Sequence, residues 1–315
     1  DSCSVESFMK ILLWTDMEGI SQITDHRECW PAYPQYWQTG RRKYTSEVIA
    51  AALGLLEGGA TEVFVVNGHG LGWPNLLREE FPNRVRLSED RERETRMDAL
   101  FQLGFHARCG TPDGFISHTF VPYFRVSVND ALITESHAAG WRVGVPVLGV
   151  VGDEALGKQL DGALSGTPFL EVKRSTSRTE TKPLHASPGA SADAIHVFAS
   201  QCIRESCQRK APGLPSMFTV AVSLEPDLAD LAVGKSGLTR RSPAVLTRQA
   251  RDWRQDADPA IQEAMGAALT PLLKAIGDLD LSSEEAMRRQ TPAALERLRR
   301  YFVEWAAGNS AAWED

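Results

Sequence analysis

Short apolar runs alternate with longer helical segments in the first half of the chain. Three of these runs are continuously apolar, which is typical of strands covered on both faces: Ile11–Thr15, Val63–Val66 and Val147–Val151. Two further β-rich runs are candidate strands, at Gly114–Ile116 and Phe124–Val128. The spacing of the runs leaves room for helices between them.

A helix is predicted between the first two runs. Thr45 or Ser46 provides an N-cap, Glu47 suits the first turn, and Gly58 and Gly59 end the segment. A strand, a helix and a strand in this order form the β-α-β unit of a parallel sheet. The chain is therefore predicted to be an α/β protein with a doubly wound, mainly parallel sheet and helices on both faces.

The rest of the chain predicts less regular structure. Residues 19–44 are rich in aromatic side chains and irregular, so we expect a long functional or interface loop there. Residues 172–194 are polar and rich in Pro and Ser, and we expect them to connect two lobes. A helix near residues 192–207, a strand near 218–223 and several C-terminal helices follow.

The last helix has the clearest signals. Thr291 caps it, Pro292 fits its first position and Gly308 follows it. One face carries an apolar stripe, which we interpret as packing rather than as a cofactor contact: Leu295, Leu298, Phe302 and Trp305. The predicted organisation is an extension or tag at 1–8, an α/β core at 9–171, a smaller α+β lobe at 172–275 and a helical extension at 276–315.

Composition narrows the class of protein. The 315 residues are 43% hydrophobic and 24% charged, which is ordinary for a globular protein. With 34 basic and 41 acidic residues the net charge is −7, which argues against nucleic acid or an anionic membrane as a partner. No apolar run approaches the roughly 20 residues of a membrane helix. Five cysteines without a Cys-x-x-Cys pair and an opening unlike a signal peptide favour a reduced, cytoplasmic protein.

Acidic and imidazole side chains gather where the apolar runs end. Asp16 and Glu18 follow the first run and His69 follows the second, while three more follow later β-rich segments: His106, His118 and Glu135. The carboxyl ends of strands in an open α/β sheet meet at one edge, where reactive groups lie. We therefore expect these side chains to lie together.

The pair Asp16 and Glu18 predicts a bound cation. Two residues apart on extended backbone, their side chains point to the same side, and two buried anions repel unless a cation neutralises them. Each residue alone also has an ordinary explanation, since both acids suit a plain loop. His69 between Gly68 and Gly70 suits a tightly packed imidazole. The prediction of a metal site depends on the several residues together.

The chain resembles the zinc-dependent D-aminopeptidases of bacteria. The resemblance spans roughly residues 10–274 and weakens past Arg178. It is carried, in the family's order, by TDMEGI at Thr15–Ile20, TEVFVVNGHG at Thr61–Gly70, GFHARCGTPDGFISH at Gly104–His118, VNDALITE at Val128–Glu135, VPVLGVVGD at Val145–Asp153 and VKRSTSR at Val172–Arg178. It implies an aminopeptidase that releases N-terminal D-amino acids from short peptides or amides. It also implies a homo-oligomer, with rings known in the family.

The resemblance implies a site with two zinc ions per subunit that activate a water. Five residues match the family's metal ligands: Asp16, Glu18, His69, His106 and Glu135. His118 matches the residue assigned as the nucleophile. Because a free imidazole attacks an amide poorly, proton transfer is a more natural task for His118, and its role stays open between the two.

The sequence also departs from the family's pattern. Asn67 stands where the family has an acid, two residues before His69, and such an acid would be expected to orient the imidazole. Asp113 makes the His106–His118 loop one residue longer, and residues 276–315 have no counterpart.

Three alternatives to a D-aminopeptidase remain. A two-zinc hydrolase of another small amide is a close variant. A phosphatase of the haloacid-dehalogenase type is disfavoured, because DMEG lacks the second Asp of that motif and the histidines suit zinc rather than magnesium. A non-catalytic binding protein is disfavoured because every matched ligand is present.

Overall fold

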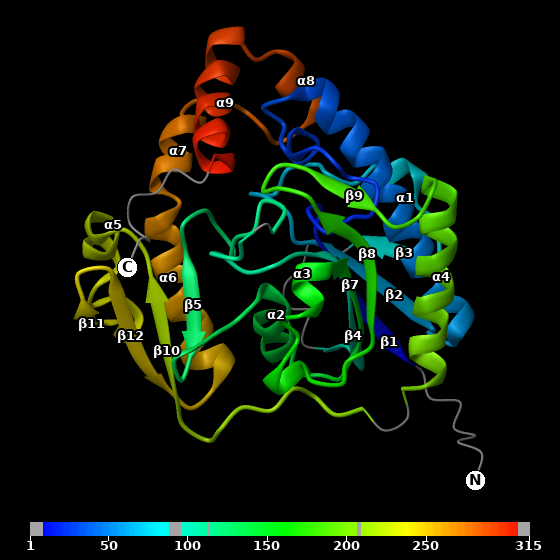
Figure 1. The fold of residues 1–315 in the computed structure, drawn as a ribbon, viewed down its shortest axis with the longest axis horizontal. Helices are drawn as coiled ribbons and strands as arrows, with labels where there is room; N and C mark the ends of the chain where they lie inside the picture. Colours follow the sequence, from blue (N-terminus) through cyan, green and yellow to red (C-terminus); the bar gives the residue numbers. More distant parts are fainter. Residues whose placement is uncertain (1–8, 88–95, 113, 207–208, 308–315) are drawn as a thin grey trace.

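The computed structural model describes residues 9–87, 96–112, 114–206 and 209–307. Its centre is a seven-stranded sheet with the order β3-β2-β1-β4-β7-β8-β9 (Figure 1). In chain order the strands are β1 (Lys10–Thr15), β2 (Glu62–Asn67), β3 (Val85–Leu87), β4 (Ala99–Phe105), β7 (Val147–Asp153), β8 (Phe169–Ser175) and β9 (Thr181–Pro183). All neighbours pair in parallel except β8 and β9. The predicted mainly parallel sheet is confirmed.

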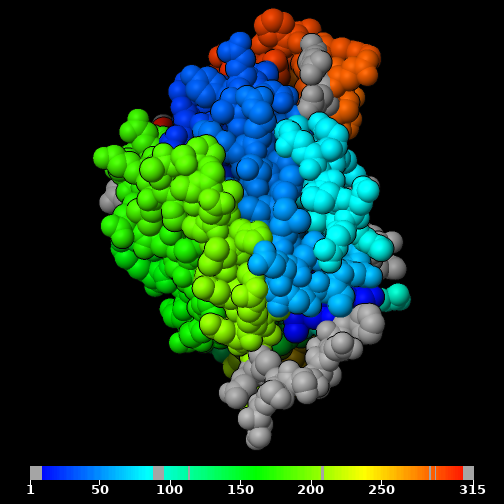
Figure 2. Space-filling view, turned by 90° about the vertical axis from the view of Figure 1, so that its right-hand side faces the viewer, coloured from blue at the N-terminus to red at the C-terminus, as the bar shows by residue number. Residues whose placement is uncertain are grey.

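Helices cover both faces of this sheet, and alternation along β1 explains why. Ile11 and Leu13 pack in the cluster that includes α1 (Pro34–Gly58) and α4 (Pro188–Arg204). Leu12 points the other way, into the cluster with α2 (Glu135–Val143) and α3 (Glu154–Gly157). Figure 2 shows α1 and α4 side by side on one face of the molecule. A strand buried on both sides must be apolar along its covered part, as β1 is from Ile11 to Trp14.

The aromatic segment at residues 19–44 is more ordered than predicted, because its second part belongs to α1. The predicted start at Thr45 or Ser46 is wrong, because α1 begins at Pro34. Trp37 and Tyr44 are buried by the tertiary fold, and this burial stabilises helix where the sequence resembles a loop. The predicted end is confirmed, since α1 stops at Gly58 and Gly59 has a positive φ of 124°.

Other predicted elements have mixed outcomes. The strand at Gly114–Ile116 is wrong: the described residues form a turn, with Ile116 at a positive φ of 37°. The strand β10 (Phe218–Ser223) and the Thr291 cap of α9 (Pro292–Ala306) are confirmed. The helix predicted near 192–207 begins earlier, at Pro188. Asp113 and Gly308 lie outside the described residues.

A second, antiparallel sheet has the order β11-β12-β10-β5-β6. Besides β10 it contains β5 (Arg125–Val128), β6 (Ala131–Leu132), β11 (Thr239–Ser242) and β12 (Val245–Ala250). The remaining helices are α5 (Pro226–Ala232), α6 (Asp258–Ala268), α7 (Thr270–Ile276) and α8 (Glu284–Arg288). The predicted division near residue 172 stays a prediction; β8 spans that point, and β5 and β6 pair with the later β10.

Two findings bear on the protein's environment. Within the described ranges, no helix combines the length and the apolar character that crossing a membrane requires. Three cysteines in the described part of the chain have free thiols: Cys29, Cys109 and Cys202.

Glu47, buried on α1, gives a test of the packing behind the sheet. The Ser21 amide donates to its Oε2 at 3.0 Å, while Oε1 has no partner, and burial raises the pKa of Glu47 to about 7. Between its ordinary pKa and about 7 the folded state holds a proton that the unfolded state has lost. Its stabilisation is therefore full below about pH 4.5 and lost as the pH rises through 7.

We predict that Glu47→Gln removes this pH dependence. In chelated protein, the free energy of unfolding of the wild type should fall relative to Glu47→Gln by about 3 kcal/mol between pH 4.5 and 8. Urea unfolding at several pH values measures this. Glu57→Gln, on an exposed part of the same helix, is the matched control. Parallel pH curves for wild type and Glu47→Gln would contradict the prediction.

Candidate metal centre

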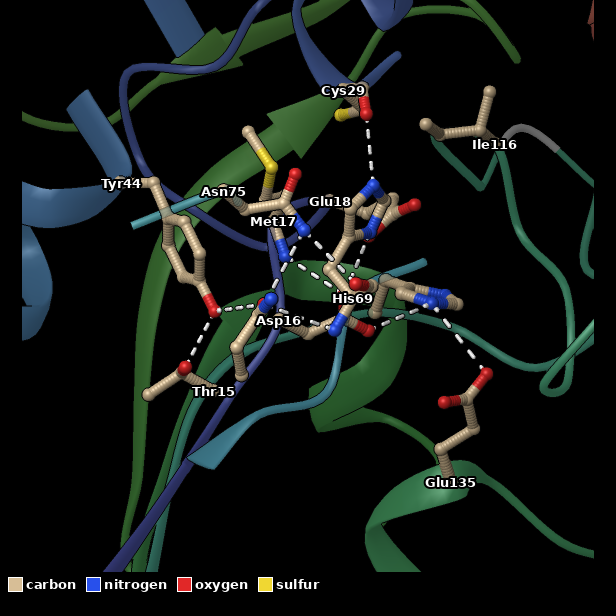
Figure 3. Close-up of polar contacts among 12 residues, drawn as sticks. Thr15, Asp16, Met17, Glu18, Cys29, Tyr44, His69, Asn75, Ile116 and Glu135 are labelled. Atoms are coloured by element: carbon tan, nitrogen blue, oxygen red, sulfur yellow. Dashed lines mark hydrogen bonds and ion pairs between the residues drawn. The ribbon is translucent and has the colours of Figure 1, made fainter. Parts of the chain in front are cut away.

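The predicted site residues meet at the carboxyl edge of the seven-stranded sheet. Asp16 follows β1, His69 follows β2 and His106 follows β4. Glu135 is the first residue of α2, whose N-cap is Thr134. His118 comes from the loop after β4. The structure brings all six predicted side chains, Glu18 included, into one cluster in which Glu135 is partly buried and the others are buried. Figure 3 labels four of them, Asp16, Glu18, His69 and Glu135.

His69 is held with one nitrogen aimed at the two acids. Its Nε2 lies 2.8 Å from the carbonyl oxygen of Cys29, which only accepts, so Nε2 carries the hydrogen and donates it. Its Nδ1 lies 3.1 Å from Asp16 Oδ1 and 3.0 Å from Glu18 Oε2 (Figure 3). Backbone anchoring of one ring nitrogen is how proteins present the other to a metal.

His106 and His118 repeat this arrangement. Their Nδ1 atoms donate to the carbonyl oxygens of Ala107 at 2.9 Å and Ile116 at 2.8 Å. His106 Nε2 then lies 3.8 Å from Glu135 Oε1, and His118 Nε2 lies 4.0 Å from it. The two rings stack with centroids 4.2 Å apart. Each imidazole therefore turns a nitrogen toward the carboxylates.

The chain closes around the acids by bringing the loop after β1 into direct backbone contact with the end of β4. The amide of Gly19 donates to the carbonyl of Gly104 at 2.7 Å, and a Cβ at Gly19 would lie 2.0 Å from the oxygen of Phe105. Gly104 has a positive φ of 80°, and a Cβ there would lie 1.9 Å from the oxygen of Asp16. The glycine behind the two acids is needed because the end of β4 occupies the space of any side chain.

Asn67 does not orient the imidazole of His69, contrary to the role expected for an acid at this position. Its Oδ1 accepts from the hydroxyl of Tyr44 at 3.2 Å, and its Nδ2 donates to the carbonyl of Trp73 at 3.1 Å. The carbonyl of Cys29 holds the imidazole instead. Asn67 therefore ties the loop after β2 to α1.

Burial and neighbouring charges shift the pKa values of the three acids in different directions. Burial would raise the pKa of Asp16, but the imidazoles of His106 and His69 beside it hold that pKa well below its usual range. Burial, followed by the charge of Asp16, raises the pKa of Glu18. Burial also raises the pKa of Glu135, to about 7. Three acids this close cannot all ionise without positive charge beside them.

The histidines respond to those acids. Burial would lower the pKa of His69 and of His106, but nearby carboxylates outweigh it. The pKa of His69 rises well above its usual value and that of His106 to about 10. His118 differs, because burial and then the charge of His106 hold its pKa well below the usual value. In the protein without a cation, protons on two imidazoles balance the acids.

The donor set fits a divalent metal. Glu18 Oε1 and His106 Nε2 are buried and have no hydrogen-bond partner. Ligand atoms of Asp16, Glu18 and His106 lie within 4.8 Å of one another, and so do those of His106, His118 and Glu135. Imidazole nitrogens combined with carboxylate oxygens are typical ligands of zinc and related metals. A bound cation would take the place of the imidazole protons.

A cavity of about 310 Å³ lies over the cluster. It reaches Asp16, Glu18, His69, His118 and Glu135, but most of its lining is apolar or aromatic. Sequence reasoning missed four aromatic residues that line it: Trp30, Trp73, Phe302 and Trp305. The bulk of the segment before α1 was the one signal for Trp30, whereas Phe302 and Trp305 were interpreted as packing alone.

Comparisons with known proteins agree with this fold and place the chain in a family. Residues 9–257 match the peptidase M55 family, the D-aminopeptidases. A D-aminopeptidase of Bacillus subtilis (strain 168) is 32% identical over 190 residues, which cover 56% of this chain and 68% of that protein. The solved structure of the Zn-dependent D-aminopeptidase DppA from Bacillus subtilis, a self-compartmentalizing protease, has the same fold. Its TM-score is 0.76 at 23% identity, over 83% of this chain and 98% of that one.

The fold and the site define a peptidase with its acids and imidazoles at the carboxyl edge of an α/β sheet. The chain belongs to the D-aminopeptidase family of peptidases. The predicted class, a hydrolase of the aminopeptidase type, is confirmed at this level. Neither a phosphatase nor a non-catalytic protein is favoured.

We predict that a divalent metal stabilises the chelated protein through these carboxylates. Adding Zn²⁺ should raise the melting temperature, because a ligand that binds the folded state at 100 times its Kd adds about 2.7 kcal/mol. Glu18→Gln should weaken zinc binding at least about tenfold, because it removes a charged donor from the cluster. Differential scanning calorimetry with a zinc titration measures both, with exposed Glu57→Gln as the control. Equal shifts in all three proteins would remove Glu18 from the site.

Proposed function

We propose that the chain is a zinc-dependent D-aminopeptidase that releases the N-terminal D-residue of short peptides or amides. Asp16, Glu18, His69, His106 and Glu135 would hold two zinc ions in each subunit. The proposal is supported by family membership and by the description of DppA as Zn-dependent. We also propose that the chain forms a homo-oligomer, as the description of DppA as self-compartmentalizing suggests, and that the protein is cytoplasmic.

One observation carries the proposal: the donor atoms converge while their other sides are fixed. The carbonyls of Cys29 and Ala107 occupy the far nitrogens of His69 and His106. The near nitrogens therefore face carboxylates in a buried space with two unpaired polar atoms. A cluster built only for packing would not leave buried acids and imidazoles turned toward a common centre.

The zinc ions and the protein chain would make different contributions to the reaction. When bound, a pair of zinc ions supplies Lewis acidity toward a carbonyl group and lowers the pKa of water. The three carboxylates neutralise most of the ions' charge and leave the site electrophilic. The protein supplies fixed donor positions and a cavity that holds the substrate against them.

His118 is assigned a proton-transfer role. Its Nδ1 donates to Ile116, so Nε2 is the atom that faces the site, with Glu135 Oε1 at 4.0 Å. We propose that Nε2 takes a proton from the attacking water as oxygen adds to the carbonyl carbon. The same nitrogen then delivers that proton to the departing amine as the C–N bond breaks.

The cavity supports a small substrate. About 310 Å³ lies at the lower end of the range for small-molecule sites, so an amino-acid amide or a dipeptide suits it better than a long chain. The preference for the D configuration is taken from the family. A hydrolase of another small amide, with the same two zinc ions, is the alternative that a substrate test separates.

Hydrolysis of D-alaninamide tests this function. We predict turnover by the zinc-loaded protein that is lost after chelation and restored by zinc, with L-alaninamide hydrolysed at least about tenfold more slowly. Glu135→Gln should nearly abolish turnover. Release of ammonia measures the rate. Turnover of neither alaninamide by protein with two bound zinc ions would leave the metal site standing and contradict the substrate assignment.

His118→Gln separates proton transfer from metal binding. If His118 transfers protons, kcat should fall by about 10²- to 10⁴-fold, while KM and the zinc content per chain stay near the wild-type values. Steady-state kinetics and elemental analysis of the same sample give both numbers. A loss of one zinc ion in this variant would instead make His118 a ligand.

A further inference from the structure

Four aromatic side chains form one side of the cavity, and we call them the aromatic wall: Trp30, Trp73, Phe302 and Trp305. Phe302 stacks on Trp30 with ring centroids 4.4 Å apart, and Trp305 meets Trp30 edge-on at 4.8 Å. Trp73 meets Trp30 edge-on at 6.3 Å. These contacts make the wall one packed unit rather than four separate side chains.

Half of the wall comes from beyond the part of the chain that the family shares. The family match ends at residue 257, whereas Phe302 and Trp305 lie on α9. Among the contacts of α9, three hydrogen bonds tie it to segments that lie earlier in the chain. Arg299 Nε donates to the carbonyl of Ala32 at 2.7 Å, the Tyr123 hydroxyl to that of Glu304 at 3.2 Å, and Arg178 to that of Trp305 at 3.5 Å. These hydrogen bonds therefore fix α9 against three separate segments of the chain, at Ala32, Tyr123 and Arg178.

The wall touches the candidate catalytic cluster directly. The ring centroids of Trp30 and His69 lie 5.2 Å apart, and those of Trp305 and His118 lie 5.1 Å apart. All four wall residues border the cavity that reaches Asp16 and Glu135. A substrate bound at the cluster must place a neighbouring group against aromatic rings.

We propose that the aromatic wall selects substrates whose N-terminal D-residue has an aromatic or large apolar side chain. This inference rests on the proposed function. In an aminopeptidase the residue with the free amine lies nearest the reacting carbonyl, so its side chain is the group that reaches the wall. Aromatic rings bury a large apolar area and stack on other rings, whereas a methyl group leaves most of the wall uncovered.

The kinetic test compares D-phenylalaninamide with D-alaninamide, which differ only in this side chain. The zinc-loaded wild type should show a kcat/KM at least about tenfold higher for D-phenylalaninamide. Phe302→Leu keeps an apolar side chain but removes a ring that does not touch His118. It should lower that ratio about fivefold or more. Val303→Ala, 56% exposed on the same helix, is the matched control and should change neither rate.

A binding experiment tests the aromatic wall without measuring hydrolysis. Trp30, Trp73 and Trp305 are themselves fluorescent reporters, and D-phenylalanine and D-alanine are products that the enzyme does not hydrolyse. D-phenylalanine should change the tryptophan emission of the full zinc-loaded chain at concentrations at least about tenfold below those D-alanine needs. Phe302→Leu should shrink this difference, and its thermal melt shows whether it folds.

The outcomes separate the two proposals. Chelator-sensitive hydrolysis of D-alaninamide at a kcat/KM equal to or above that for D-phenylalaninamide overturns the wall's role and leaves the proposed function intact. Hydrolysis of neither amide overturns the proposed function, and the fluorescence titration then decides whether the wall binds aromatic side chains. If Phe302→Leu does not fold, the wild-type comparisons of the two amides and of the two amino acids still decide whether the wall selects aromatic side chains.

Discussion

The repulsion among three neighbouring carboxylates is the constraint on which the rest of this structure depends. Asp16 and Glu18 are buried and Glu135 is partly buried beside them, and such a cluster cannot stay ionised without positive charge beside it. In the protein alone, protons on His69 and His106 supply that charge. A pair of zinc ions would supply more of it and would also satisfy the unpaired atoms. The same electrostatic requirement therefore explains both the composition of the cluster and its proposed chemistry.

The fold meets this requirement with backbone rather than with side chains. Parallel strands deliver Asp16, His69 and His106 to one edge, and backbone carbonyls fix the far side of each imidazole. Gly19 and Gly104 let the loop after β1 touch the end of β4 directly, which brings the acids within reach of the histidines. The C-terminal helices α6, α7 and α9 line another side of the cavity. Their aromatic side chains cover the cluster and would exclude water from a bound substrate.

Local patterns predicted the parallel sheet, the end of α1 and the cap of α9, because apolar runs, glycines and caps are properties of a few neighbouring residues. They also predicted which acids and histidines would gather, since strand ends in a parallel sheet share an edge. The predicted start of α1 and the predicted strand at Gly114–Ile116 were wrong, because distant packing decides both segments. The carbonyl of Cys29 behind His69 gave no sequence signal at all. The position of Phe302 and Trp305 against the cavity followed from how α9 docks, which its apolar stripe alone does not specify.

The most direct test of the central claim is to locate the metal itself. Anomalous scattering at the zinc absorption edge from crystals of the zinc-loaded protein would give the number and positions of the ions. The account predicts two peaks among Asp16, Glu18, His69, His106 and Glu135, with His118 beside them but not bonded to either. No peak in this cluster, a single peak, or a peak ligated by His118 would contradict it.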